Sequence, residues 1–298
     1  MWTGMMPAIT TKFKEDGSLD AAATEKSMAL QIAAGNAGII TCGTLGEGNM
    51  LSHDERLEVV RIAKSVTGAK PALLTVSEPG TREACDLARR AASAGADGLM
   101  VVPSPIYHTN YEETIANLKA IAAAGNLPIM IYSNRVSYRV DVTPEMMVEL
   151  AEDEHMVAIK ESSDDIRRCT EIFNTVGDRF KVFTGVDNLG LEAILMGCDG
   201  WVSGVSIAIP EENQKLYDLA KAGRIEEARE LYRWMRPLLD LDVSTFLVQQ
   251  IKLAEKIAFG SEEYVRAPRM PLVGEHRARV DALVNERFAC RPDLSKYN

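Results

Sequence analysis

Apolar residues recur along the chain in eight short, continuous runs that are separated by longer stretches with helical spacing. The runs are rich in β-branched or other apolar residues and do not alternate with polar positions. Continuous runs of this length are typical of strands buried on both faces of a parallel sheet. We therefore expect strands within residues 4–10, 37–43, 72–77, 97–103, 128–133, 156–161, 180–185 and 199–204.

The stretches between these runs predict helices, as in residues 81–96 and 143–154. Thr143, Pro144 and Glu145 supply an N-cap, a proline at the first helical position and an acid in the first turn. Eight strands that alternate with helices favour an α/β fold of the (β/α)8 TIM-barrel type. A doubly wound open sheet is the competing fold, because periodicity alone does not distinguish it from a closed one. The segment GTLGEG lacks the G-x-G-x-x-G dinucleotide fingerprint of that competitor.

The strand signals stop after Pro210, and the rest of the chain has helical patterning. Breaks are expected near Gly223 and around Pro237, and residues 277–289 predict a last helix. We expect a barrel over residues 1–223 and a C-terminal helical extension over residues 224–298. No linker rich in Pro, Gly or Ser separates the two parts, so the extension is expected to pack on the barrel.

Composition and charge exclude several classes of function. A net charge of −10 disfavours a nucleic-acid surface. The five cysteines lack C-x-x-C spacing and the four histidines lack metal-ligand spacing, so no disulfide framework and no metal site is predicted. No phosphate-cradling glycine loop is present, and we expect no cofactor. The chain has no apolar stretch long enough for a membrane span and no signal-peptide pattern, so we expect a cytoplasmic protein.

Candidate chemistry gathers where the predicted strands end, which is the edge that carries the active site of a TIM barrel. Thr44, Tyr107, Tyr132 and Lys160 all follow or end such strands. A desolvated lysine has a lowered pKa, and its neutral amine attacks carbonyl carbon to form a Schiff base. A tyrosine hydroxyl nearby can move the protons that this reaction requires. Taken one at a time, Lys160 could form a structural ion pair, Tyr132 could be a core residue and Thr44 could belong to a turn.

Three motifs in this order resemble the dihydrodipicolinate synthase/N-acetylneuraminate lyase superfamily of class I Schiff-base lyases. They are GTLGEGNMLSHDER (43–56), MIYSN (130–134) and AIKESSDD (158–165). FTGVD (183–187) and GCDGWVSG (197–204) fall where that family has a pyruvate-contacting glycine and a small-residue loop. The resemblance covers nearly the whole chain, including the helical extension.

The resemblance implies roles for individual residues. Lys160 would be the Schiff-base amine, Tyr132 the acid/base group, and Thr44 the hydroxyl that passes protons between Tyr132 and Tyr107. Tyr107 would come from the neighbouring subunit of a tight dimer within a homotetramer. The backbone N–H groups around Thr44 and Leu45 would hold the substrate carboxylate. The resemblance also places Leu45, Asn134, Gly185 and Val202 in the substrate-binding site.

Departures from the family pattern bear on the substrate. The arginine that grips a second carboxylate in dihydrodipicolinate synthase would fall at Ser137, and Arg135 or Arg139 could replace it only with a different loop path. The second threonine of the family's loop is Leu45. The pattern around Tyr132 and Tyr138 is more similar to the branch that deaminates 1-pyrroline-4-hydroxy-2-carboxylate in hydroxyproline degradation. That resemblance favours release of 2,5-dioxopentanoate and ammonia from this cyclic imino acid.

Other functions stay open at this point. Within the same chemistry, the chain could be a dihydrodipicolinate synthase that joins pyruvate to aspartate semialdehyde, a pyruvate-dependent aldolase or a 2-keto-3-deoxy-sugar-acid dehydratase. A ligand-binding protein that keeps the barrel without turnover is a different class, because fold alone does not fix function. A metal-assisted lyase would need a cluster of carboxylates and histidines that the predicted strand ends lack.

Overall fold

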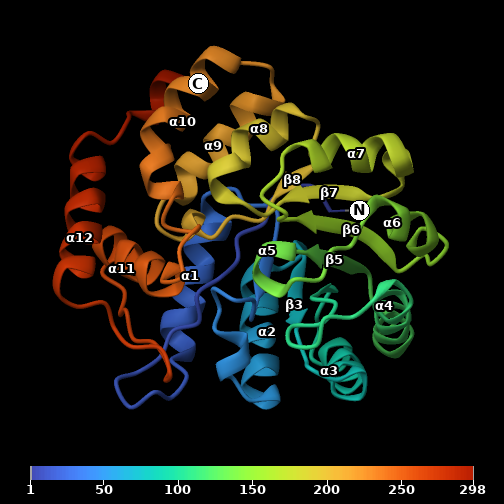
Figure 1. Ribbon diagram of the computed structural model, residues 1–298. Coiled ribbons are helices and arrows are strands. Elements are labelled where there is room, and N and C mark those ends of the chain that lie inside the picture. Colours follow the sequence, from blue (N-terminus) through green and yellow to red (C-terminus); the bar gives the residue numbers. More distant parts are fainter. Residues whose placement is uncertain (1, 298) are drawn as a thin grey trace.

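The computed structural model describes residues 2–297, and in it eight parallel strands follow one another around a barrel (Figure 1). The strand order is β1-β8-β7-β6-β5-β4-β3-β2. The strands are β1 (Gly4–Met5), β2 (Ile39–Thr41), β3 (Ala72–Val76), β4 (Gly98–Val101), β5 (Ile129–Ser133), β6 (Met156–Glu161), β7 (Lys181–Thr184) and β8 (Gly200–Trp201). Each lies within one of the eight predicted runs, so the pattern of continuous apolar segments identified every strand.

The barrel closes between β2 and the segment that follows β1. Ala8 and Ile40 form a parallel bridge, and the N–H of Ile9 donates to the carbonyl of Ile40 at 2.9 Å. On the other side of this segment, the N–H of Ala8 donates to the carbonyl of Ser203 at 2.9 Å. These bonds link the two ends of the strand order. The predicted TIM barrel is therefore confirmed, and the doubly wound alternative is wrong.

Helices surround the barrel and continue beyond it. The helices that follow β1 to β7 are α1 (Ala21–Ala33), α2 (His53–Thr67), α3 (Thr81–Ser93), α4 (Tyr111–Gly125), α5 (Arg135–Tyr138), α6 (Pro144–Leu150), α7 (Arg167–Val176) and α8 (Gly190–Leu195). After β8 come α9 (Pro210–Lys221), α10 (Ile225–Leu239), α11 (Leu247–Phe259) and α12 (Gly274–Ala289). In Figure 1 the orange and red helices α11 and α12 form a lobe beside the barrel.

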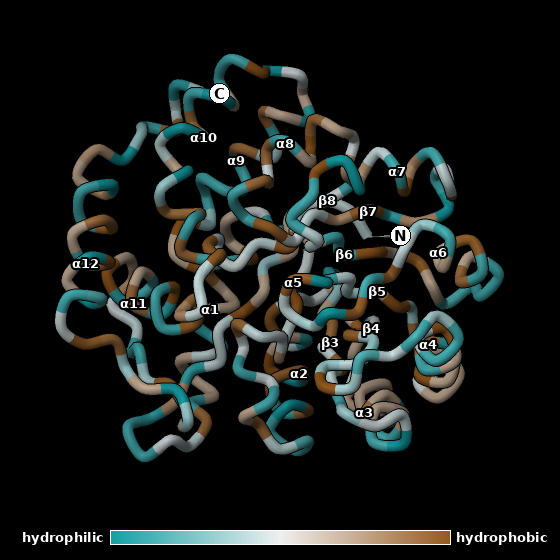
Figure 2. The backbone as a smooth tube through the Cα atoms, in the orientation of Figure 1, coloured by the Kyte–Doolittle hydropathy of each residue, from teal (hydrophilic) through white to brown (hydrophobic). Residues whose placement is uncertain are grey.

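The hydropathy of the chain matches this arrangement. Figure 2 shows hydrophobic segments along the strands and hydrophilic ones on the outer turns. Every residue of β2, β3, β4 and β5 is buried. This is the burial expected of strands that face the barrel interior on one side and the helices on the other. No helix within residues 2–297 is long and apolar enough to cross a membrane.

Local sequence signals account for several helix boundaries. The side chain of Thr143 accepts a hydrogen bond from the N–H of Met146, and Pro144 begins α6, as the sequence predicts. The expected break near Gly223 is present between α9 and α10. The break expected around Pro237 is also present, because α10 ends at Leu239 and α11 begins only at Leu247. Pro237 lies in the last turn of that helix, where two further residues follow it before the helix ends. The domain boundary at residue 223 stays a prediction.

Buried charges connect the C-terminal helices to the start of the barrel. Lys252 on α11 is fully buried, and its Nζ lies 2.6 Å from Oε1 of Glu47 in the loop after β2. The other carboxylate oxygen of Glu47 accepts a 3.0 Å hydrogen bond from the N–H of Arg266. On the same helix, Glu255 pairs with the buried amine of Lys12. Since removing one partner of a buried pair leaves an uncompensated charge, these contacts hold the two parts of the chain in place.

Lys252→Met should lower the free energy of unfolding by about 3–5 kcal/mol, because it leaves the Glu47 carboxylate without its closest cation. The matched control is Lys119→Met, whose pair with Glu149 is more than one third exposed on both sides. Breaking such an exposed pair should cost about 0–1 kcal/mol. Urea unfolding followed by circular dichroism measures both changes. Equal losses for the two variants would show that the buried pair does not stabilise the fold.

Candidate active site

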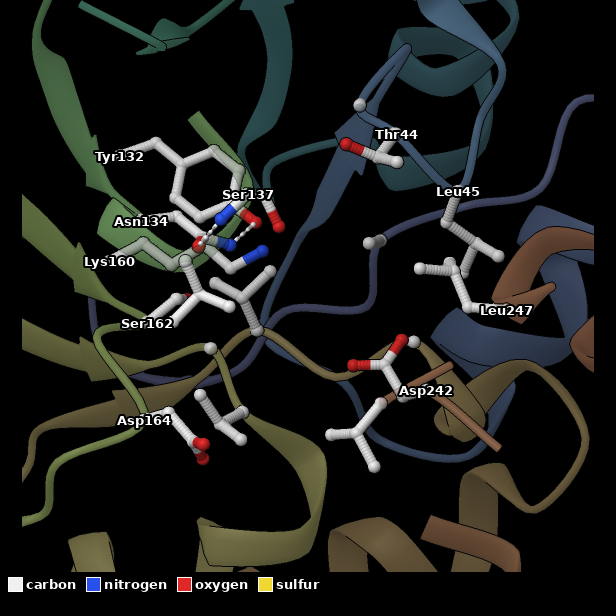
Figure 3. A pocket seen from close by; sticks show the side chains of 18 of the residues that line it. Thr44, Leu45, Tyr132, Asn134, Ser137, Lys160, Ser162, Asp164, Asp242 and Leu247 are labelled. Carbon is white, nitrogen blue, oxygen red and sulfur yellow. Dashed lines mark hydrogen bonds between the residues drawn. The ribbon is translucent and has the colours of Figure 1, made fainter. Parts of the chain in front are cut away.

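A cavity of about 440 Å³ opens at the carboxyl edge of the strands (Figure 3). Figure 3 shows Tyr132, Asn134 and Lys160 on one side of it, with Leu45 and Asp242 across from them. Segments far apart in the sequence therefore meet at one place. The strand ends supply most of the lining: residues 43–45 after β2, 132, 134, 136 and 137 from β5 and α5, 160, 162 and 164 from β6, and 185, 186, 202 and 204 from β7 and β8. The connection from α10 to α11 adds residues 242–245, and residue 247 follows at the start of α11. Ala8 and Met100 complete the lining.

Lys160 is the only positively charged side chain that lines this cavity within residues 2–297. It pairs in register with Tyr132 of the neighbouring strand β5, and its Nζ lies 4.0 Å from the centre of the Tyr132 ring. The residue is 7% exposed, and its amine makes no hydrogen bond and no ion pair within the described chain. Burial lowers the pKa of Lys160, against the opposing charge of Asp242. The structure thus gives no support to a structural ion pair at this lysine.

Gly185, at the end of β7, makes room for the lysine side chain. A Cβ at this position would lie 2.3 Å from Cε of Lys160 and 2.2 Å from Oγ of Ser162. Any side chain here would displace the amine from its path along the cavity wall. The predicted site residue Gly185 therefore lies beside Lys160 in the cavity lining, and its contact with pyruvate stays a prediction.

Tyr132 and Asn134 form a hydrogen-bonded unit beside the amine. The Nδ2 of Asn134 donates to Oη of Tyr132 at 3.0 Å, while Oδ1 of Asn134 accepts from the N–H of Ser137 at 2.8 Å. Asn134 thereby caps the start of α5 and fixes the tyrosine hydroxyl with one side chain. Burial raises the pKa of Tyr132 to about 12, so the hydroxyl keeps its proton at neutral pH and can donate it.

The hydroxyl of Thr44 is in contact with a tyrosine, but that tyrosine is Tyr138 of the same chain. Its Oη lies 2.7 Å from Oγ1 of Thr44, and its ring meets that of Tyr132 edge-on with centroids 5.7 Å apart. Tyr107 lies outside the cavity of its own chain, is 60% exposed and donates to Oε1 of Glu113 at 3.2 Å. Its contact with a neighbouring subunit stays a prediction. Sequence reasoning named Tyr138 only as part of a motif and gave it no contact in the site, because it is the last residue of the short helix α5 rather than the end of a strand.

The loop after β2 adopts the strained conformation that such sites often show. Cys42 and Glu47, neither of them glycine, have φ angles of 58° and 52°. Between them the backbone N–H groups of Thr44 and Leu45 donate to no group within residues 2–297. Unpaired N–H groups that face a cavity can hold an anion such as a substrate carboxylate. The side chain of Leu45 is buried and adds an apolar patch to the wall.

Asp187 fixes the loop after β8 through hydrogen bonds. Its buried carboxylate accepts hydrogen bonds from Nε1 of Trp201 at 2.9 Å, from the N–H of Gly204 at 3.1 Å and from the N–H of Val205 at 2.7 Å. Burial raises the pKa of this carboxyl to about 6. The loop so fixed presents the predicted site residue Val202 to the cavity.

The two arginines that the sequence offers as replacements for the family's carboxylate-binding arginine do not line the cavity. Arg135 lies 3.7 Å from Asp141 and 3.8 Å from Asp165, and neither Arg135 nor Arg139 lines the cavity. Ser137 does line it, so no arginine stands where the family's second-carboxylate arginine would fall. The site therefore has little positive charge to offer a dicarboxylic substrate.

Asp242 lines the cavity but was not predicted, because the sequence analysis looked for site residues only at the ends of the predicted strands. It lies in the connection from α10 to α11, outside the eight strand-and-helix units. The sequence did contain a weak signal, because this aspartate stands between Leu241 and Val243 in the apolar run PLLDLDV. An acid in an apolar run is costly to bury, and it is a candidate for a functional group.

The fold and the site together define a (β/α)8 barrel with a buried, unpaired amine at the carboxyl edge of its strands. Residues 1–287 match the model of the Dihydrodipicolinate synthetase family, and the chain belongs to that family. It is 34% identical over 284 residues to the 4-hydroxy-tetrahydrodipicolinate synthase of Pelodictyon phaeoclathratiforme, which covers 94% of this chain and 95% of the relative.

Solved structures agree with this assignment. The dihydrodipicolinate synthase of Aquifex aeolicus is similar with a TM-score of 0.90 and 27% identity, over 96% of this chain and 98% of that one. The prophage protein YagE of Escherichia coli K12, solved in complex with pyruvate, is similar with a TM-score of 0.91 and 26% identity, over 97% of this chain and all of that one. The predicted membership of the superfamily is therefore confirmed.

Tyr132→Phe should lower kcat by about 10²–10⁴-fold, because it removes the hydroxyl of the tyrosine beside the amine while keeping the ring. The matched control is Tyr217→Phe, which removes a hydroxyl that donates to the carbonyl of Asp199. Tyr217 does not line the cavity. Steady-state kinetics of both variants on one substrate measure the effect. A Tyr132→Phe enzyme with full kcat would exclude this tyrosine from proton transfer.

The rate at which borohydride traps a 2-oxo acid on the protein should rise with pH, with a midpoint below pH 10.5. Only the neutral amine attacks a carbonyl, and burial lowers the pKa of Lys160 from 10.5, so that the neutral form appears at lower pH than in an exposed lysine. Mass spectrometry after trapping at a series of pH values gives the midpoint. A midpoint at or above 10.5 would mean that the amine is as well hydrated as a surface lysine.

Proposed function

We propose that the protein is a lyase that forms a Schiff base between Lys160 and a small 2-oxo or cyclic imino acid. The observation that carries this proposal is the amine itself, which lies buried at the cavity wall without a neutralising partner. Membership of the family supports the same chemistry. A solved relative in complex with pyruvate supports a 2-oxo acid as the first reactant.

The residues of the cavity fit the steps of this reaction. The neutral amine of Lys160 attacks the C2 carbon and forms a carbinolamine. The hydroxyl of Tyr132 gives its proton to the departing oxygen, which leaves as water, and the nitrogen becomes an iminium. The iminium then draws electrons from the neighbouring carbon, where a proton is removed or a bond is formed. The N–H groups of Thr44 and Leu45 hold the substrate carboxylate during these steps.

Proton movement beyond Tyr132 would pass through Thr44. Within one chain the contact from Thr44 continues to Tyr138 at 2.7 Å, so we include Tyr138 in the proposed path. The sequence resemblance implies that Tyr107 of a neighbouring subunit joins the same path in a homotetramer. The exposure of Tyr107 on its own chain leaves it free for such a contact.

The names of the relatives favour one of the activities that the sequence left open. They are 4-hydroxy-tetrahydrodipicolinate synthases, and they support the condensation of pyruvate with aspartate semialdehyde better than the deamination first favoured by the sequence. We therefore take the synthase reaction as the first candidate. The pyruvate-dependent aldolase and the sugar-acid dehydratase use the same Schiff base and remain within the proposed class.

One observation keeps deamination of 1-pyrroline-4-hydroxy-2-carboxylate as the second candidate. Aspartate semialdehyde carries its own carboxylate, and the cavity offers no arginine to receive it. The cyclic imino acid has a single carboxylate, which the N–H groups of the loop after β2 can hold. Its hydroxyl leaves as water and its ring nitrogen as ammonia, while two water molecules enter by hydrolysis and supply the carbonyl oxygens of 2,5-dioxopentanoate. Neither loss requires a second cation.

Borohydride treatment of the wild-type protein with pyruvate should add one reduced pyruvate to Lys160, as peptide mass spectrometry would detect. Lys160→Ala should lose the adduct and keep its circular dichroism spectrum, because the side chain lies at the cavity wall rather than between strands. The matched control is Lys181→Ala, whose amine pairs with Asp199 and does not line the cavity. An adduct on another lysine, or no adduct with any 2-oxo acid, would end the proposal.

The two candidate reactions are separated by assaying wild-type protein with each substrate. The synthase consumes aspartate semialdehyde only in the presence of pyruvate, whereas the deaminase releases ammonia from the cyclic imino acid alone. Ammonia release without any condensation would make deamination the first candidate and remove the synthase reaction.

A further inference from the structure

Asp242 brings a carboxylate into the cavity from outside the barrel strands. It lies in the connection between α10 and α11, and Figure 3 shows its side chain directed into the cavity across from Lys160. Its carboxylate makes no hydrogen bond and no ion pair within residues 2–297, although it is only partly exposed. A carboxyl group that is largely removed from solvent is normally hydrogen-bonded. The missing partner of Asp242 therefore points to a ligand that binds in the cavity.

The backbone beneath Asp242 is shaped to accept the carboxyl group. A Cβ on Gly204 would lie 2.5 Å from Oδ1 of Asp242, so only glycine permits the present position of the side chain. Gly204 is fixed in turn by the bond from its N–H to the carboxylate of Asp187. Gly204 therefore leaves room for the carboxyl group of Asp242 in the cavity wall.

A comparison with Asp187 shows how unusual the free carboxyl is. Asp187 is fully buried, and its carboxylate accepts four hydrogen bonds, from Trp201, Ser203, Gly204 and Val205. Asp242 accepts none, and burial together with the charge of Asp187 raises its pKa. The first carboxylate is structural, and the second one faces the space that a substrate would occupy.

We propose that Asp242 binds a hydroxyl group on the substrate, beyond the carbon that reacts with Lys160, and so selects hydroxylated 2-oxo or imino acids over dicarboxylic ones. This inference rests on the proposed Schiff-base function and adds the substrate class. It favours a hydroxylated 2-oxo acid or the cyclic imino acid over the synthase reaction, because the enzyme-bound product of pyruvate and aspartate semialdehyde carries two carboxylates. It assigns Asp242 as a specificity-determining residue.

A hydroxyl group fits this position better than a second carboxylate does. A hydroxyl both donates and accepts hydrogen bonds, so it can pair with the carboxyl of Asp242 in either protonation state. A carboxylate can only accept, so it pairs with Asp242 only while that carboxyl is protonated. Next to an ionised Asp242 it would place two like charges together. Lys160 is the only lysine or arginine that lines the cavity within the described chain, and its amine is bonded to the reacting carbon in the Schiff base. It is therefore not available to pair with a second carboxylate. Ser244 and Thr245 line the same side and can extend the hydrogen bonds to a polar substrate.

Three five-carbon probes test the proposal: 2-oxopentanoate, 4-hydroxy-2-oxopentanoate and 2-oxoglutarate. For each enzyme, the concentration dependence of borohydride trapping on Lys160 gives an apparent affinity for each probe. The readout is the ratio of affinities between two probes on the same enzyme. This ratio cancels any change that a variant makes to the reactivity of the amine itself, which the charge of Asp242 also influences.

Wild-type protein should prefer the hydroxylated probe to the unsubstituted one, and it should bind 2-oxoglutarate least well. Asp242→Asn should reduce the preference for the hydroxylated probe about tenfold, because a charged acceptor becomes a neutral one. The same variant should bind 2-oxoglutarate better relative to 2-oxopentanoate. Asp242→Ala removes the acceptor altogether and should reduce the hydroxyl preference by about 10- to 100-fold.

The matched control is Asp178→Asn, which removes a negative charge from an exposed residue that does not line the cavity. The control should leave both ratios unchanged. Unchanged ratios in both Asp242 variants would overturn the inference, and so would an equal shift in the Asp178 control. Absence of trapping on Lys160 in the wild-type protein would instead refute the proposed function.

Discussion

The site depends on one constraint: an amine has to enter a cavity in which no carboxylate forms an ion pair with it. The buried position of Lys160 and the aromatic face of Tyr132 beside it meet that constraint, because neither supplies a full negative charge at close range. Desolvation favours the neutral amine, and the neutral amine is the form that reacts with carbonyl carbon. The missing side chain at Gly185 then keeps the path of the lysine clear.

The supports of the site come from parts of the chain that are distant in sequence. Glu47 closes the loop that carries Thr44, and its carboxylate is held by Lys252 on α11. The C-terminal helices are thus joined by buried charges to a backbone segment of the cavity wall. Strain at Cys42 and Glu47 is maintained only because the surroundings fix both residues.

Sequence reasoning identified the parts of the molecule that follow from local chemistry. The eight strands and the start of α6 could be predicted because burial on two faces and a Thr-Pro cap leave direct traces in the sequence. Lys160 and Tyr132 could be predicted as neighbours because both end adjacent strands of a barrel. The placement of Asp242 could not, since it depends on how distant segments pack. The partner of Thr44 was equally hidden, because a short helix turns Tyr138 back toward the strands.

The position of Asp242 places the residue proposed for substrate selection on a different part of the chain from the residues that react. The reactive groups stand on strands β5 and β6, whose geometry the whole barrel fixes, whereas the acid facing them stands on a short helix-to-helix connection. Such a connection tolerates changes in length and sequence that a central strand does not. A few substitutions in that connection could therefore change the substrate of a protein with this architecture, while the reactive lysine and tyrosine on the strands stay the same.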